Sequence, residues 1–134
     1  MRIFKTKGLA KFARRERIAD ASMREAIGRA ERGIIDADLG GGLIKQRVAR
    51  PGQGRSGGYR MMVAYRTKDR AIFLLGFAKN ERENISPKEL AALRELVKVW
   101  LRASDDQIAT AMDDDILQEV TDEKNIEDDK DESA

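Results

Sequence analysis

Apolar residues in the first part of the chain recur every three or four positions, which is the period of amphipathic helices. Residues 7–17 and 19–34 both show this spacing. The apolar positions are Leu9, Phe12, Ala13, Ala19, Met23, Ala26, Ile27, Ala30 and Ile34. We predict two helices that form a hairpin with one apolar side. The second helix is expected to start at an Asp20 N-cap, or at a capping box over residues 22–25, and to end near Gly33.

Between residues 43 and 78 the period changes to two, which is typical of strands. Residues 43–50 alternate, with Ile44 and Val48 on one face and basic residues on the other. Residues 59–66 alternate in the same way, whereas residues 71–78 are apolar on both faces and are expected to form a central strand. A further short strand at residues 3–4 is predicted at an edge of the sheet.

The third helix has the clearest start in the chain. Ser86 as N-cap, Pro87 at the first helical position and Glu89 at the third form a reciprocal capping box. An apolar stripe then continues to about residue 103, at Leu90, Leu93, Val97 and Trp100. Residues 105–120 keep helical spacing within an acidic segment, which predicts an amphipathic helix. From residue 121 onward apolar side chains almost vanish, which predicts disorder.

Together these elements predict an α+β fold, in which an N-terminal helical hairpin packs on a small antiparallel sheet of three to four strands and a C-terminal helix follows. A chain of 134 residues is long enough for one such domain. We place this domain at residues 1–103 and an acidic C-terminal extension at residues 104–134.

The chain contains neither His nor Cys. Disulfides are therefore excluded, and a zinc site, a catalytic triad or a Cys–His nucleophile is not expected. We expect no metal and no cofactor. A signal peptide or membrane span is not expected either, because the longest apolar stretch, residues 71–78, is interrupted by Gly76. The expected compartment is the cytoplasm.

Residues 52–57, GQGRSG, match the GxGxxG pattern of dinucleotide-binding loops. That motif requires a strand before it and a helix after it, whereas a strand follows here, so we expect no nucleotide cofactor. A flexible glycine loop that carries Arg50 and Arg55 toward a backbone phosphate fits the sequence better.

The net charge of +2 conceals a segregation of charge along the chain. Residues 1–102 carry 24 Lys and Arg against 11 Asp and Glu, whereas residues 103–134 carry 2 against 13. Such asymmetry points to a polyanion-binding body with an acidic appendage. One hypothesis is that residues 105–134 fold back over the basic face and moderate it, and the alternative is a solubilising tail.

Seven basic residues lie on the predicted strands or directly beside them: Lys45, Arg47, Arg50, Arg55, Arg60, Arg66 and Lys79. Such a cluster suits phosphodiester chemistry, because arginines hold a phosphate through two hydrogen bonds and stabilise the charge that builds on its oxygens. Like charge also lowers the pKa of a lysine in such a cluster toward a value useful for a base. RNA supplies its own nucleophile, the 2′-OH. A passive RNA-binding face, or salt-bridged strands, would use the same residues.

Three segments in this order resemble the RelE/HigB group of toxins from bacterial toxin–antitoxin pairs. They are Lys45-x-Arg47-x-x-Arg50, RSGGYR at residues 55–60 with a strand after it, and GFAKNER at residues 76–82. The predicted order of elements is similar too, over roughly residues 3–101. Residues 41–60 resemble the HigB-type branch in particular.

The resemblance implies a RelE/ParE-like fold and a small, metal-independent endoribonuclease that cleaves mRNA in the ribosomal A site. Such an mRNA interferase inhibits translation, arrests growth and is neutralised by a cognate antitoxin, which we expect to be a helix-turn-helix protein in a hetero-oligomeric complex. The candidate catalytic residues are Lys45, Arg47, Arg60 and Lys79. The candidate RNA-binding residues are Arg50, Arg55, Tyr59, Arg66 and Arg82.

By position, Lys45 and Arg47 match paired basic residues that position phosphate and take part in proton transfer, and Arg60 matches the contact to the scissile phosphate. The sequence departs from the group at Asn80, where relatives have a basic residue, and near Ser86, where they have a tyrosine. The general base is therefore left unassigned.

Tyr59 or Tyr65 could stack on a base in place of that tyrosine, although a tyrosine on an apolar strand face more often belongs to the core. Two other functions also stay open. The same fold is used by relatives that poison DNA gyrase by binding, and the basic face could serve a non-catalytic RNA- or DNA-binding module.

Overall fold

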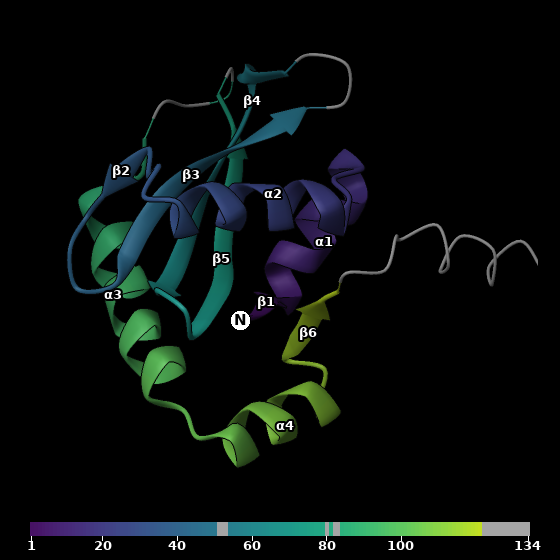
Figure 1. Cartoon of the computed structure of the whole chain (residues 1–134), viewed down its shortest axis with the longest axis vertical. Coiled ribbons are helices and arrows are strands. Elements are labelled where there is room, and N and C mark those ends of the chain that lie inside the picture. The colour runs from purple at the N-terminus through teal and green to yellow at the C-terminus, as the bar shows by residue number, and fades with distance from the viewer. Residues whose placement is uncertain (51–53, 80, 82–83, 122–134) are drawn as a thin grey trace, which may run out of the picture.

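The computed structural model describes residues 1–50, 54–79, 81 and 84–121, without the side chains of residues 50 and 54–56. The described elements, in chain order, are β1 (Arg2–Thr6), α1 (Lys7–Glu16), α2 (Asp20–Glu31), β2 (Ala37–Asp38), β3 (Leu43–Arg50), β4 (Gly54–Arg66), β5 (Arg70–Ala78), α3 (Pro87–Arg102), α4 (Asp105–Asp113) and β6 (Leu117–Val120). They form one sheet with helices on both faces, as Figure 1 shows. The predicted α+β class, the helical hairpin and the three long strands are confirmed.

The sheet is larger than the three to four strands that the sequence predicted. Its order is β2-β3-β4-β5-β1-β6, and every neighbouring pair is antiparallel except β1 and β5, which are parallel. The prediction of β1 as an edge strand is wrong, because β1 pairs with β5 on one side and with β6 on the other. The true edges are the short strands β2 and β6, which are too brief to show a period of two in the sequence.

The two faces of the sheet bury two separate groups of apolar side chains. On one face Ile44, Val48 and Met61 pack under α1 and α2, as the alternation predicted. Gly76 allows this packing, because a Cβ atom there would lie 2.6 Å from Cε2 of Phe12 on α1. On the other face Met62 packs with residues of α3 and α4.

The starts of two helices test the predicted caps. For α3 the prediction is confirmed, since the Ser86 hydroxyl accepts a hydrogen bond from the Glu89 N–H at 3.1 Å and the Glu89 carboxylate accepts one from the Ser86 N–H at 2.9 Å. For α2 both alternatives are wrong, because Ala19 is the N-cap. Asp20 instead lies buried in the first turn, where its carboxylate accepts hydrogen bonds from Lys5 Nζ at 2.7 Å and from the Thr121 N–H at 3.4 Å.

The predicted helix over residues 105–120 is also wrong in its second half. Helix α4 ends at Asp113, Asp115 has a positive φ of 61°, and β6 follows. Aspartates 113–115 explain the stop, since a carboxylate is unfavourable at the negative end of the helix dipole and aspartate favours turns. The strand that follows places Leu117 in one apolar group and Val120 in the other.

The division of the chain after residue 103 stays a prediction. Against it, Ile108 and Ala111 of α4 are buried with residues of the sheet, and β6 is paired with β1. Residues 122–134, for which disorder was predicted, lie outside the described residues. Within the described part of the chain, no helix is long and apolar enough to cross a membrane.

Candidate functional site

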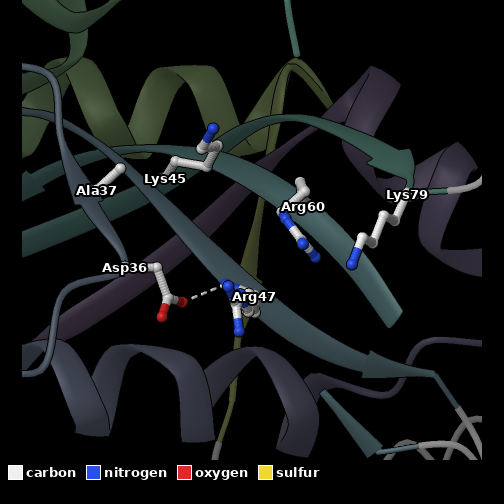
Figure 2. A pocket seen from close by; sticks show the side chains of 6 residues that line it. All are labelled: Asp36, Ala37, Lys45, Arg47, Arg60 and Lys79. Carbon is white, nitrogen blue, oxygen red and sulfur yellow. Dashed lines mark hydrogen bonds between the residues drawn. The ribbon is translucent and has the colours of Figure 1, made fainter. Parts of the chain in front are cut away.

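An open hollow of about 300 Å³ lies on the sheet face that α3 and α4 cover only in part. It is lined by Asp36, Ala37, Lys45, Arg47, Arg60 and Lys79. Figure 2 shows these side chains on neighbouring segments of the sheet, from the edge at β2 across β3 and β4 to the end of β5. The structure thus brings together the four residues that the sequence singled out as catalytic, and their catalytic role stays a prediction.

Arg47 on β3 and Arg60 on β4 are direct cross-strand partners. The backbone N–H of Arg47 donates to Asp36 Oδ2 at 2.6 Å and its C=O accepts from the Arg29 guanidinium, so both groups point away from β4. Arg47 and Arg60 therefore form a non-hydrogen-bonded pair, the kind whose Cα atoms lie only about 4.5 Å apart. Like charges directly opposite each other repel. The strand register thus holds two guanidinium groups within reach of a single anion.

Arg60 is buried, with only 9% of its surface exposed, and no described residue accepts a hydrogen bond from its Nη1. Burial lowers the pKa of Arg60, the neighbouring Arg47 lowers it further, and Asp36 opposes both effects. An arginine nevertheless stays charged in proteins. A buried donor without a partner costs roughly 1–3 kcal/mol, and a bound anion would remove that cost.

The two lysines complete a hollow with four cationic side chains and one carboxylate. Lys45 lies two residues before Arg47 on the same side of β3, and Lys79 follows the last residue of β5 directly. In Figure 2 the ends of Arg60 and Lys79 turn toward each other, while Lys45 lies on the other side of Arg60. Such an excess of positive charge suits a phosphate group and its neighbours along a nucleic acid.

Tyr59, a candidate for stacking on a base, lies on the opposite face of the sheet and is only 2% exposed. Its hydroxyl donates to Glu16 Oε1 at 3.0 Å, and its ring meets Phe12 edge-on at 5.6 Å. The core alternative is therefore confirmed for the position of Tyr59, and its RNA-binding role stays a prediction that this burial does not favour. Tyr65 is similarly buried, with its hydroxyl bonded to Glu31.

Arg66 also lies apart from the hollow. It is six residues beyond Arg60 on β4, about 20 Å at the rise of a strand, and it pairs with Asp69 at 2.9 Å. The remaining RNA-binding candidates cannot be placed in this way. The side chains of Arg50 and Arg55, and the whole of Arg82, lie outside what the structure describes, as does Asn80.

Asp36 and Ala37 line the hollow, although neither was a candidate from the sequence. Their place follows from β2, whose two residues pair with β3 so that Ala37 lies opposite Lys45. A two-residue strand leaves no periodic signal. The tendency of an acidic residue to lie near a basic cluster was the one available clue, and it does not distinguish Asp36 from Asp38.

A family model described as the RelE toxin of the RelE/RelB toxin–antitoxin system matches residues 1–120, a range that includes α4 and β6. No curated protein sequence matches the chain.

Proposed function

This chain belongs to the RelE toxin family of toxin–antitoxin systems, which implies an antitoxin partner, and from this premise we propose that it is an endoribonuclease that cleaves mRNA on the ribosome. In this proposal it arrests translation, and thereby growth, until the antitoxin neutralises it. Membership of the HigB-type branch remains a prediction from residues 41–60.

The observation that carries the proposal is that Nη1 of buried Arg60, directly opposite Arg47, has no acceptor among the residues that the structure describes. A surface that only attracts RNA needs exposed cations, which keep their hydration until the RNA arrives. A buried guanidinium that lacks an acceptor is instead preorganised for one anion at one place. Preorganised donors of this kind stabilise the charge that develops in a transition state.

In the proposed reaction Arg60 and Arg47 hold the scissile phosphate, and the adjacent 2′-OH of the RNA attacks its phosphorus. A bond forms from O2′ to phosphorus and the bond from phosphorus to O5′ breaks, which leaves a 2′,3′-cyclic phosphate and a 5′-hydroxyl. The proton of the 2′-OH passes to a base, and O5′ receives a proton as it leaves. Lys45 and Lys79, on opposite sides of Arg60, are our candidates for these two transfers.

We further propose that the substrate is mRNA in the ribosomal A site, in the cytoplasm, and that the partner is a helix-turn-helix antitoxin in a hetero-oligomeric complex. An open hollow is consistent with this substrate, because the mRNA strand must enter the hollow from the side while it stays bound to the ribosome. The antitoxin would then act by covering the hollow or by displacing residues that line it.

The experiment is controlled expression with mapping of mRNA 5′ ends, for the wild type beside Arg60→Ala and Arg66→Ala. Arg66, an RNA-binding candidate on the same strand but outside the hollow, is the comparison, because loss of such a contact should weaken binding without removing cleavage. We expect new 5′ ends within translated codons for the wild type and for Arg66→Ala, and none for Arg60→Ala.

Two outcomes would contradict the proposal. Growth arrest without new 5′ ends would favour inhibition by binding, with DNA damage as the sign of a gyrase target. Cleavage that persists in a folded Arg60→Ala protein would remove Arg60 from the reaction.

A further inference from the structure

Arg47 lies at a place where β3 has lost its outer neighbour. Strand β2 begins at Ala37 and pairs antiparallel with β3 only at Lys45 and Ile44, so the position opposite Arg47 lies before its first residue. On the inner side the register between β3 and β4 shifts between Val48 and Arg50. The outward-facing backbone groups of Arg47 therefore have no partner in β2, and the Arg47 side chain faces a like charge on β4.

Two side chains take the place of the missing strand. Asp36 Oδ2 accepts from the Arg47 N–H at 2.6 Å, and Arg29 Nη2 donates to the Arg47 carbonyl. Arg29 also donates from Nη1 to Asp36 Oδ2 at 3.3 Å, so the two side chains are joined to each other. Both outward-facing backbone groups of Arg47 are thus satisfied by an ion pair.

The ion pair between Arg29 and Asp36 is itself held by further hydrogen bonds. Arg29 is only 3% exposed, and its Nε donates to Glu25 Oε2 at 2.9 Å, so all three sides of its guanidinium are used. The buried Gln46 accepts from the Asp36 N–H at 2.7 Å and donates to the Ala26 carbonyl at 2.9 Å. Helix α2, the segment before β2 and the end of β3 are therefore tied into one unit.

We propose that Arg29, Asp36 and Gln46, here called the edge clamp, position Arg47 beside Arg60 for the reaction. The clamp holds the backbone of β3 where two arginines repel each other, and the Asp36 carboxylate offsets part of that repulsion. None of the three was a candidate from the sequence. Their role rests on the proposed function, since it names what places a residue of the same site.

If the clamp positions Arg47, its loss should lower the cleavage rate without lowering the affinity for RNA. Loss of Asp36 would let Arg47 move away from Arg60, and a misplacement of about 1 Å in a catalytic group slows a reaction on the order of 100-fold. The same change removes the single negative charge among the residues that line the hollow, so RNA affinity should not fall. A protein that had simply unfolded would lose both.

The test compares Asp36→Ala and Asp36→Asn with the wild type and with Asp69→Ala, a control aspartate paired with Arg66 outside the hollow. The first readout is hydrogen exchange of the Arg47 amide in the isolated protein, which needs no activity. We expect exchange to be faster by about 10-fold or more in Asp36→Ala, and nearer the wild type in Asp36→Asn, whose side-chain oxygen still accepts a hydrogen bond. The Arg47 amide in Asp69→Ala should exchange as in the wild type.

The second readout is the single-turnover cleavage rate on ribosomes programmed with mRNA, beside the affinity for the same mRNA with 2′-O-methyl groups. Asp36→Ala should cut the rate about 100-fold with unchanged or tighter binding. In an Arg47→Ala background Asp36→Ala should have little further effect, because a positioning residue acts through the residue that it positions.

Several outcomes would overturn the inference. Unchanged exchange of the Arg47 amide in Asp36→Ala would show that no clamp operates. A further loss of rate in the Arg47→Ala background would mean that Asp36 acts on the substrate directly. If the wild type does not cleave at all, the proposed function and the catalytic role of the clamp both fail, while the exchange experiment still decides whether the clamp holds Arg47.

Discussion

Two buried arginines lie at opposite ends of the same sheet face, and they are treated differently. Arg70 starts β5 under the junction of α3 and α4, where it donates to the carbonyls of Trp100 and Ala103 at 2.9 and 2.7 Å and pairs with Asp105 at 3.3 Å. Arg60 lies in the uncovered half, in a hollow with three other cationic side chains, and its Nη1 has no acceptor within the described structure. Arg70 thus bonds to the end of α3, whereas Arg60 keeps a donor available for a ligand.

The difference separates stability from function on one surface. The carbonyls at the end of α3 have no partner within the helix, and Arg70 satisfies two of them. Among the described residues, Nη1 of Arg60 has no acceptor, and Arg60 faces the repulsion of Arg47. A fold gains no stability from such a residue, so its presence is better explained by a ligand.

The largest expected effect comes from Arg60→Met, which should abolish cleavage while the protein stays folded. Removal of one preorganised donor typically lowers a rate about 100- to 1000-fold. The free energy of unfolding should stay the same or rise, because an apolar side chain of similar length replaces a buried charge. Urea unfolding measured beside the cleavage rate checks both halves. A clear loss of stability would mean that Arg60 has a partner in the fold after all.

Arg70→Met should show the opposite behaviour and thereby complete the comparison. It leaves the carbonyls of Trp100 and Ala103 without their donor, and hydrogen bonds from a charged group contribute about 1.5–3 kcal/mol each. We expect the free energy of unfolding to fall by about 3–6 kcal/mol, with no change in RNA affinity below the melting temperature. Loss of RNA affinity in the folded protein would show that both ends of this face bind RNA.

Much of this arrangement could be predicted from the sequence. The alternation in residues 43–50 placed Lys45 and Arg47 on one face and Ile44 and Val48 on the other, and the structure agrees. The capping box at Ser86 gave the start of α3 without error. These features depend on residues close together in the chain, where period and capping chemistry decide the outcome.

The parts that could not be predicted depend on contacts between distant segments. The pairing of Arg47 with Arg60 is a matter of register, which the alternation alone does not fix. An arginine on a helix is usually exposed, so nothing in the sequence indicated that Arg29 is buried. It is buried because the fold brings Asp36 and the Arg47 carbonyl against it. Tyr59 shows the reverse case, in which the apolar strand face correctly favoured the core over a role in binding.

A smaller effect on stability is expected from Tyr59→Phe. Tyr59 lies on the face that α1 and α2 cover, opposite the face with the hollow, so this change tests whether only the latter binds RNA. The change removes the hydrogen bond to Glu16 and leaves the edge-on contact with Phe12. The free energy of unfolding should fall by about 0.5–1.5 kcal/mol, the usual contribution of such a bond. RNA affinity and cleavage should match the wild type, as fluorescence anisotropy and the cleavage assay would show. A weaker affinity of Tyr59→Phe for RNA would mean that Tyr59 takes part in RNA binding.

The smallest effect is expected at the far edge of the sheet, where Arg2 of β1 pairs with Glu119 of β6 at 2.9 Å. The hydrogen bond from Arg2 holds the pKa of Glu119 below its ordinary value, against the opposing effect of burial. A lowered pKa in the folded state means that the carboxylate stabilises the fold at neutral pH. That contribution is lost as the pH falls from the ordinary value of 4.5 through the lowered one.

Glu119→Gln should therefore lower the free energy of unfolding near pH 7, by no more than about 0.5–1 kcal/mol because both side chains are partly exposed. The difference between variant and wild type should shrink as the pH falls from 4.5 through the lowered pKa of Glu119, because the wild-type carboxylate becomes protonated. Urea unfolding of both proteins across this range checks the slope. A difference that stays constant with pH would mean that the ion pair contributes nothing and that β6 is held to β1 by its backbone pairing and its buried residues alone.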